Sequence, residues 1–126
     1  EKWLKTPGPI APPSSKANII ARSCRYHSNY AFWEQLVQEY IDKAVYLGHE
    51  KEYEYFKYTY PRMKDVPRKE VKDLLEMAQV IEGASMFIGN QGLPHAIAEG
   101  LKKPLFNEVW RLYPAAVFKR EDATYV

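Results

Sequence analysis

Hydrophobic and polar positions along this chain follow two alternating periods. Short, nearly continuous apolar runs are typical of buried strands, and apolar residues that recur every three or four positions are typical of amphipathic helices. Strands are expected at residues 17–23, 43–48, 62–66, 86–88, 105–108 and 115–118. Helices are expected at residues 30–41, 50–58 and 67–83, and from Pro94 to Leu101.

This order of elements predicts the fold class. Strands that alternate with helices of ten or more residues imply right-handed crossovers and parallel strands. We therefore expect an α/β, Rossmann-like domain with a doubly wound, mostly parallel sheet and helices on both faces. Ligands of such sheets bind outside the carboxyl ends of the strands, which selects the loops at residues 23–29, 48–52, 89–94 and 108–113.

The first sixteen residues differ from the rest of the chain. Pro7, Pro9, Pro12 and Pro13 fall within this segment, and prolines at this density prevent regular helix or strand. We expect residues 1–16 to be a Pro-rich linker or arm, with Trp3 and Leu4 docked on the domain surface, and residues 17–126 to be the domain. The chain begins without Met, and we expect it to be an excised domain.

Charge and cysteine content exclude some function classes. Eighteen basic and sixteen acidic residues give a net charge of +2, too small to favour a nucleic-acid or membrane partner. No apolar segment is long enough for an integral membrane helix. Cys24 is the single cysteine, which fits a reducing, cytoplasmic compartment. His27 is three residues away and does not make it a convincing nucleophile. We expect no metal and no cofactor.

The segment from Met86 to Leu101 carries the candidate chemistry. Gly89 and Gly92 bracket a turn where the backbone can approach a ligand closely. Pro94 suits the first turn of a helix, and the free N–H groups of that turn form a site for phosphate or carboxylate. His95 would lie beside the bound anion. The alternative is that the glycines serve turn geometry and His95 caps the helix or packs in the core.

The same segment carries a resemblance to a known family. Phe-Ile-Gly-Asn-Gln-Gly-Leu-Pro-His at residues 87–95, followed by Pro104, resembles the donor-binding C-terminal domain of GT-B glycosyltransferases. It is most similar to glycosyltransferase family 9, the ADP-heptose:lipopolysaccharide heptosyltransferases. The resemblance covers residues 17–108, and Gly89, Gly92, His95 and Pro104 match the family pattern in order and spacing.

The resemblance implies a nucleotide-sugar substrate and transfer of the sugar to an acceptor hydroxyl. The acceptor-binding N-terminal domain, which is expected to carry the catalytic base, is missing, so this domain would bind the donor without turnover. The implied donor and phosphate contacts are Gly89, Asn90, Gln91, Gly92, Leu93, His95, Arg22, Ser23 and Arg25. The implied ribose and base contacts are Glu50, Glu52, Glu108, Trp110 and Tyr113.

The chain also departs from the family pattern. Asn90 stands where the family usually has Asp, Gln91 replaces a small hydroxyl residue, and no lysine precedes Trp33. The arginines, glutamates and aromatic residues named above also have plain structural interpretations as surface charges and packing residues. Two other functions therefore stay open: a non-catalytic binding or interaction module, and an unrelated doubly wound protein that binds another phosphorylated small molecule.

Overall fold

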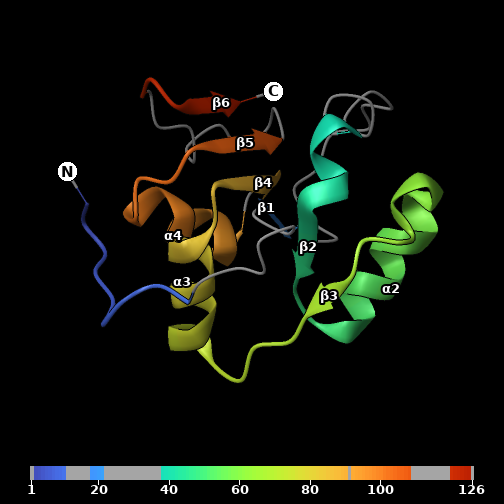
Figure 1. Ribbon diagram of the computed structural model, residues 1–126, viewed down its shortest axis with the longest axis horizontal. Coiled ribbons are helices and arrows are strands. Elements are labelled where there is room, and N and C mark those ends of the chain that lie inside the picture. The colour runs from blue at the N-terminus through green and yellow to red at the C-terminus, as the bar shows by residue number, and fades with distance from the viewer. Residues whose placement is uncertain (1, 11–17, 22–37, 91, 109–119, 126) are drawn as a thin grey trace.

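The computed structural model describes residues 2–10, 18–21, 38–90, 92–108 and 120–125. Within these ranges six strands form one sheet in the order β3-β2-β1-β4-β5-β6, and every neighbouring pair is parallel (Figure 1). The strands are β1 (Asn18–Ala21), β2 (Ala44–Leu47), β3 (Arg68–Lys69), β4 (Met86–Asn90), β5 (Leu105–Glu108) and β6 (Ala123–Tyr125). The α-helices are α2 (Glu50–Thr59), α3 (Leu74–Gly83) and α4 (Leu93–Gly100), and η1 (Gln38–Lys43) and η2 (Pro61–Met63) are 3₁₀ helices. The expected α/β, Rossmann-like class is confirmed.

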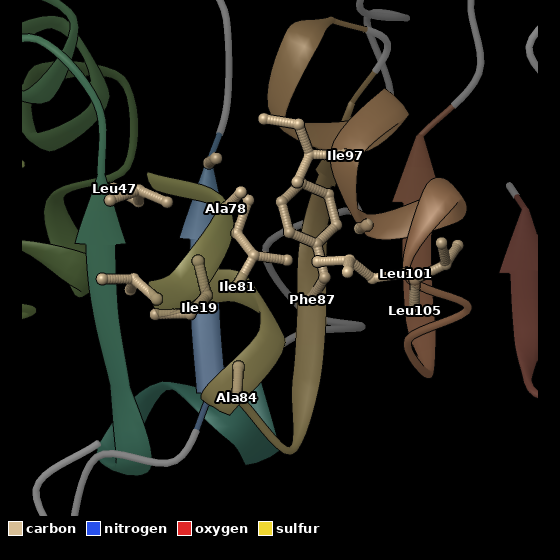
Figure 2. Close-up of a cluster of buried hydrophobic side chains, with 12 residues drawn as sticks. Ile19, Leu47, Ala78, Ile81, Ala84, Phe87, Ile97, Leu101 and Leu105 are labelled. Atoms are coloured by element: carbon tan, nitrogen blue, oxygen red, sulfur yellow. The ribbon is translucent and has the colours of Figure 1, made fainter. Parts of the chain in front are cut away.

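Alternate residues of the strands point to opposite faces of the sheet, and each face has its own apolar cluster. On one face, Ile19 of β1, Phe87 of β4 and Leu105 of β5 pack against α3 and α4. Figure 2 shows these side chains directed toward Ile81 of α3 and Leu101, the C-cap residue of α4. Helices α3 and α4 therefore cover the same side of the sheet.

The other face is covered by α2. Ile20 and Ile88 come one residue after the inward residues of the first cluster, and they pack with Tyr46 and with Phe56 of α2. The ring centroids of Tyr46 and Phe56 are 4.7 Å apart. The alternation places helices on both faces, which is the doubly wound arrangement that the sequence predicts.

The third strand and the start of the third helix are not where the sequence places them. Residues 61–63 form η2, because Pro61 suits a helical first turn, and Met63 is buried against α2. The strand β3 comes later, and the Pro67 carbonyl accepts a hydrogen bond from Tyr46 N. Pro67 therefore precedes a strand, and α3 begins after Asp73, whose carboxylate accepts from Glu76 N.

The spacing of Val71, Leu74, Leu75, Ala78 and Ile81 predicts one buried apolar stripe on the third helix, and this prediction is only partly correct. Ala78 and Ile81 are buried, but Leu74 and Leu75 are 59% and 52% exposed. Both leucines lie in the first turn of α3, and this turn is exposed, whereas the later turns are packed against the sheet.

Two other expected elements meet the limits of the described residues. Only the end of the helix expected at residues 30–41 is described, and there η1 runs from Gln38 to Lys43 as a 3₁₀ helix. The expected strand at residues 115–118 lies outside the described ranges, and β6 at residues 123–125 was not predicted.

The N-terminal arm lies against α3 and the end of α4 (Figure 1). The backbone N–H groups of Trp3 and Leu4 donate to the Gly100 carbonyl, and Ile10 N donates to the Gln79 carbonyl. The Gln79 side chain donates to the Gly8 carbonyl. Docking of Trp3 and Leu4 on the domain is as expected from the sequence. No helix of the described residues is long and apolar enough to cross a membrane.

Candidate anion site at the start of α4

The central feature of the site is the junction between β4 and α4. The chain runs outward from β1 to β2 and β3, and then returns to β4, which pairs with the other side of β1. The sheet therefore reverses its direction of winding between β1 and β4. In open α/β sheets the crevice outside the carboxyl ends of the strands at such a point is the usual ligand site. Ala21 and Asn90 end these two strands.

The two glycines of the junction have different roles. Gly89 belongs to β4, which extends two residues further than the sequence predicts. A Cβ at Gly89 would lie 2.3 Å from the Ala21 carbonyl oxygen, so strand packing requires glycine there. A Cβ at Gly92 would meet only Pro94 Cδ, at 3.9 Å, and Gly92 is exposed and extended. Among the described residues, neither space nor backbone conformation requires glycine at this second position.

The start of α4 is open to solvent. Gly92 is the N-cap residue, and no side chain of the described residues caps the helix. Pro94 has no N–H, so the backbone N–H groups of Leu93 and His95 are the orphan donors of the first turn. Leu93 is 52% exposed. The partial positive charge of the helix end and these N–H groups make the turn suitable for an anion.

The side chain of His95 points away from this open end. It is only 2% exposed, and its Nε2 lies 3.1 Å from the Tyr125 hydroxyl oxygen. The two rings meet edge to face, with centroids 5.7 Å apart. The imidazole therefore lies in the interior, and the exposed residues at the start of the helix are Gly92 and Leu93.

The buried side of α4 holds a polar network that sequence reasoning missed. Glu99 is fully buried, and its carboxylate accepts hydrogen bonds from the Tyr125 hydroxyl and, at 2.6 Å, from Arg120 Nε. Arg120 also donates through Nη2 to the Lys103 carbonyl and through Nη1 to Asp122 Oδ1. A buried carboxylate is tolerated because an arginine and a hydroxyl satisfy it.

The imidazole of His95 is neutral, and the network determines which ring nitrogen carries its proton. Burial and then the Arg120 charge lower the pKa of His95 from 6.5 to about 4, so the ring is neutral at pH 7. The Tyr125 hydroxyl has one proton, which it donates to Glu99. It therefore accepts a hydrogen bond from His95, which places the imidazole proton on Nε2. The contact of 3.8 Å between His95 Nε2 and Glu99 is not an ion pair at neutral pH.

Among the other predicted site residues, the structure brings two together. Asn90 and Glu108 are register partners at the ends of β4 and β5, and both are buried. Both lie on the face that α2 covers, because they alternate with Gly89 and Asn107. Arg22, Ser23, Arg25, Gln91, Trp110 and Tyr113 lie outside the described residues.

The two glutamates of the second loop lie at the start of α2. Glu50 is its exposed first residue. Glu52 Oε1 accepts from His49 N at 3.4 Å, as part of a capping box. Glu52 therefore has a structural role that the sequence did not reveal. The described residues contain no group of three or more His, Cys, Asp or Glu side chains that could hold a metal ion.

A last polar residue of interest is Asn107 on β5. It is fully buried, and its Oδ1 has no hydrogen-bond partner in the described structure. Its Nδ2 lies 3.3 Å from the Glu108 carbonyl.

One sequence signal could have located the polar network of His95 and Glu99. These two residues are four positions apart on an otherwise apolar helix.

Together these features define a Rossmann-like parallel α/β domain with an open helix start at the switch point of its sheet. Comparison with protein-family models, with curated proteins and with solved structures gives no match. The class therefore follows from the fold alone, and the resemblance to glycosyltransferase family 9 stays a prediction from the motif.

Proposed function

We propose that this domain is the donor-binding half of a GT-B glycosyltransferase, and that it binds the diphosphate of a nucleotide sugar at the start of α4. The observation that carries the proposal is the first turn of α4, which no side chain of the described residues caps, beside the carboxyl ends of β1 and β4. The motif at residues 87–95, on which the family resemblance rests, coincides with this β4 to α4 junction.

The proposed chemistry is stabilisation of a leaving group. When the glycosidic bond breaks, negative charge develops on the nucleotide diphosphate. The fixed N–H groups of Leu93 and His95 would stabilise that charge in the transition state, because they need no reorganisation. The catalytic base and the acceptor site belong to the partner domain of the proposed enzyme. This chain would therefore bind donor without turnover.

The geometry refines the expected role of His95. Its neutral imidazole is engaged with Tyr125, so its backbone N–H is the group proposed to meet the phosphate. Glu108 remains a proposed ribose contact and Asn90 a proposed phosphate contact, and the two are register partners at the carboxyl ends of β5 and β4. A cytoplasmic site of action, expected from the lone Cys24, stays part of the proposal.

The test is a thermal-shift and calorimetric titration of the chain with ADP, UDP, GDP and CDP. One diphosphate should stabilise the domain selectively, by about 2.7 kcal/mol when its concentration is a hundred times Kd. Gly92→Asp places a capping carboxylate on the orphan N–H groups, and its Cβ fits without a clash. It should weaken binding at least about tenfold, because charge-assisted hydrogen bonds contribute about 1.5–3 kcal/mol each.

The matched control is Ser85→Asp. Ser85 is exposed and directly precedes β4. The variant therefore adds the same charge at the amino end of β4, whereas α4 begins beyond its carboxyl end. It should leave diphosphate affinity unchanged. Equal binding by Gly92→Asp and wild type would exclude the start of α4 as the site. If no diphosphate stabilises the folded domain, the donor-binding function is wrong and the non-catalytic interaction module is favoured.

A further inference from the structure

The buried network consists of the side chains of His95, Glu99, Arg120 and Tyr125. These side chains lie on the interior side of α4, away from the proposed anion site. The network joins three segments: α4 through His95 and Glu99, β6 through Tyr125, and the turn before β6 through Arg120. Both oxygens of the buried Glu99 carboxylate are paired, and so is Nε2 of the buried His95. Such a connected network fixes the relative position of the elements that carry its members.

The hydrogen bonds of this network converge on the Glu99 carboxylate. His95 Nε2–H donates to the Tyr125 hydroxyl, which donates to Glu99, which also accepts from Arg120. His95 is the third residue of α4, and its backbone N–H is one of the two orphan donors of the first turn. The network therefore holds the same residue that presents an N–H group to the anion.

Among the described residues, few side chains other than that of His95 anchor the first turn of α4. No side chain of the described residues caps it, and both Gly92 and Leu93 are exposed. Its first deeply buried side chain is that of His95. On the other side, β6 is a three-residue strand at the end of the described sheet order, and Tyr125 is the residue that connects it to the imidazole.

We propose that Tyr125, together with Glu99 and Arg120, is a positioning clamp that sets the orientation of the first turn of α4. The C-terminal strand then controls how well the N–H groups of Leu93 and His95 are arranged for a diphosphate. The effect on affinity rests on the proposed function above. The effect on the order of the turn does not, and it is measured without any ligand.

The test is Tyr125→Phe, which removes one hydroxyl and keeps the ring. Amide hydrogen exchange at Ala96, whose N–H donates to the Gly92 carbonyl and closes the first turn, should accelerate about tenfold, because the turn opens locally more often, whereas exchange in α2 should not change. The diphosphate Kd should rise by about threefold to tenfold, the range expected for a mutation that acts through a network. Tyr58→Phe is the matched control, since the same atom is removed from an exposed tyrosine of α2.

The outcomes separate the two proposals. If wild type binds no diphosphate but Tyr125→Phe loosens the first turn, the proposed function fails and the clamp stands. Unchanged exchange at Ala96 overturns the clamp even if the variant is less stable overall. Faster exchange with an unchanged Kd overturns the control of affinity.

A second measurement needs no variant. The imidazole nitrogen shifts of wild-type protein at neutral pH should show the proton of His95 on Nε2, as the hydrogen-bond direction requires. A proton on Nδ1 would overturn the clamp, because Nε2 could not then donate to a hydroxyl that already donates to Glu99.

Discussion

The helices α2 and α4 begin at the same edge of the sheet, but their first turns are stabilised in different ways. At α2, His49 Nδ1 accepts from Lys51 N, and Glu52 accepts from His49 N. At α4, Gly92 offers no side chain, and His95 is held from the interior by Tyr125. The α2 helix satisfies the N–H groups of His49 and Lys51 with its own side chains, whereas no side chain of the described residues caps α4.

This difference indicates which helix start can bind an anion. A helix end closed by a capping box has fewer free donors and carries an added carboxylate. Among the described residues, the start of α4 has no capping box and no added carboxylate. Its stability depends on the buried contacts of His95 and Glu99. Stability and binding are therefore separated at α4, because the groups that fix the turn are not the groups that would meet the ligand.

The largest expected effect comes from breaking the interior support of α4. Arg120→Met removes the guanidinium and leaves the Glu99 carboxylate buried without its charged partner. The free energy of unfolding should fall by about 3–5 kcal/mol, the typical result of breaking one side of a buried ion pair. Urea denaturation of the variant and wild type measures this difference.

The control for Arg120→Met changes the other carboxylate that Arg120 contacts. Asp122 is half exposed, so Asp122→Asn should cost no more than about 1 kcal/mol. Equal losses for the two variants would mean that the burial of Glu99 does not matter, and the comparison between α2 and α4 would fail.

A second expected effect is a dependence of stability on pH. The pKa of His95 is lowered to about 4 by burial and by Arg120, whereas the unfolded chain has the ordinary 6.5. Between these values the unfolded state binds more protons, so stability rises with pH and is complete above about 6.5. On acidification from pH 6.5 to 4, about 2–3 kcal/mol of unfolding free energy should be lost.

The measurement is a series of denaturant titrations across that pH range, repeated with His95→Gln. The variant lacks the titrating group, so its stability should depend less steeply on pH than that of wild type. The same slope in both proteins would show that His95 is not the group responsible.

Much of the fold follows from the periodicity of the sequence, and the errors have specific causes. The strand at 86–88 and the helix at 50–58 have clear patterns and were confirmed with small shifts. The start of the third helix was misplaced because Pro67 fits both a helix and the entry to a strand. Asp73 was the stronger signal, since its carboxylate caps the helix.

The site could be predicted only in part. The β4 to α4 junction is local in sequence, so its glycines, Pro94 and His95 indicate an anion site without knowledge of the tertiary structure. The direction of the His95 side chain depends on Tyr125, which is thirty residues away on a strand that was not predicted. Glu99 likewise gave no sign of its arginine partner, because a helical glutamate is usually solvent-exposed.

The smallest expected effect is at the capped helix. His49→Ala removes the acceptor for Lys51 N, and it should lower the free energy of unfolding by about 1 kcal/mol, the usual cost of losing an N-cap. His49→Asp is the matched control, since a carboxylate restores the acceptor and should recover the stability. Urea denaturation of the variants and wild type measures these differences. If His49→Ala were as damaging as Arg120→Met, α2 would depend on its first turn as strongly as α4 depends on its interior network, and the proposed contrast between them would be wrong.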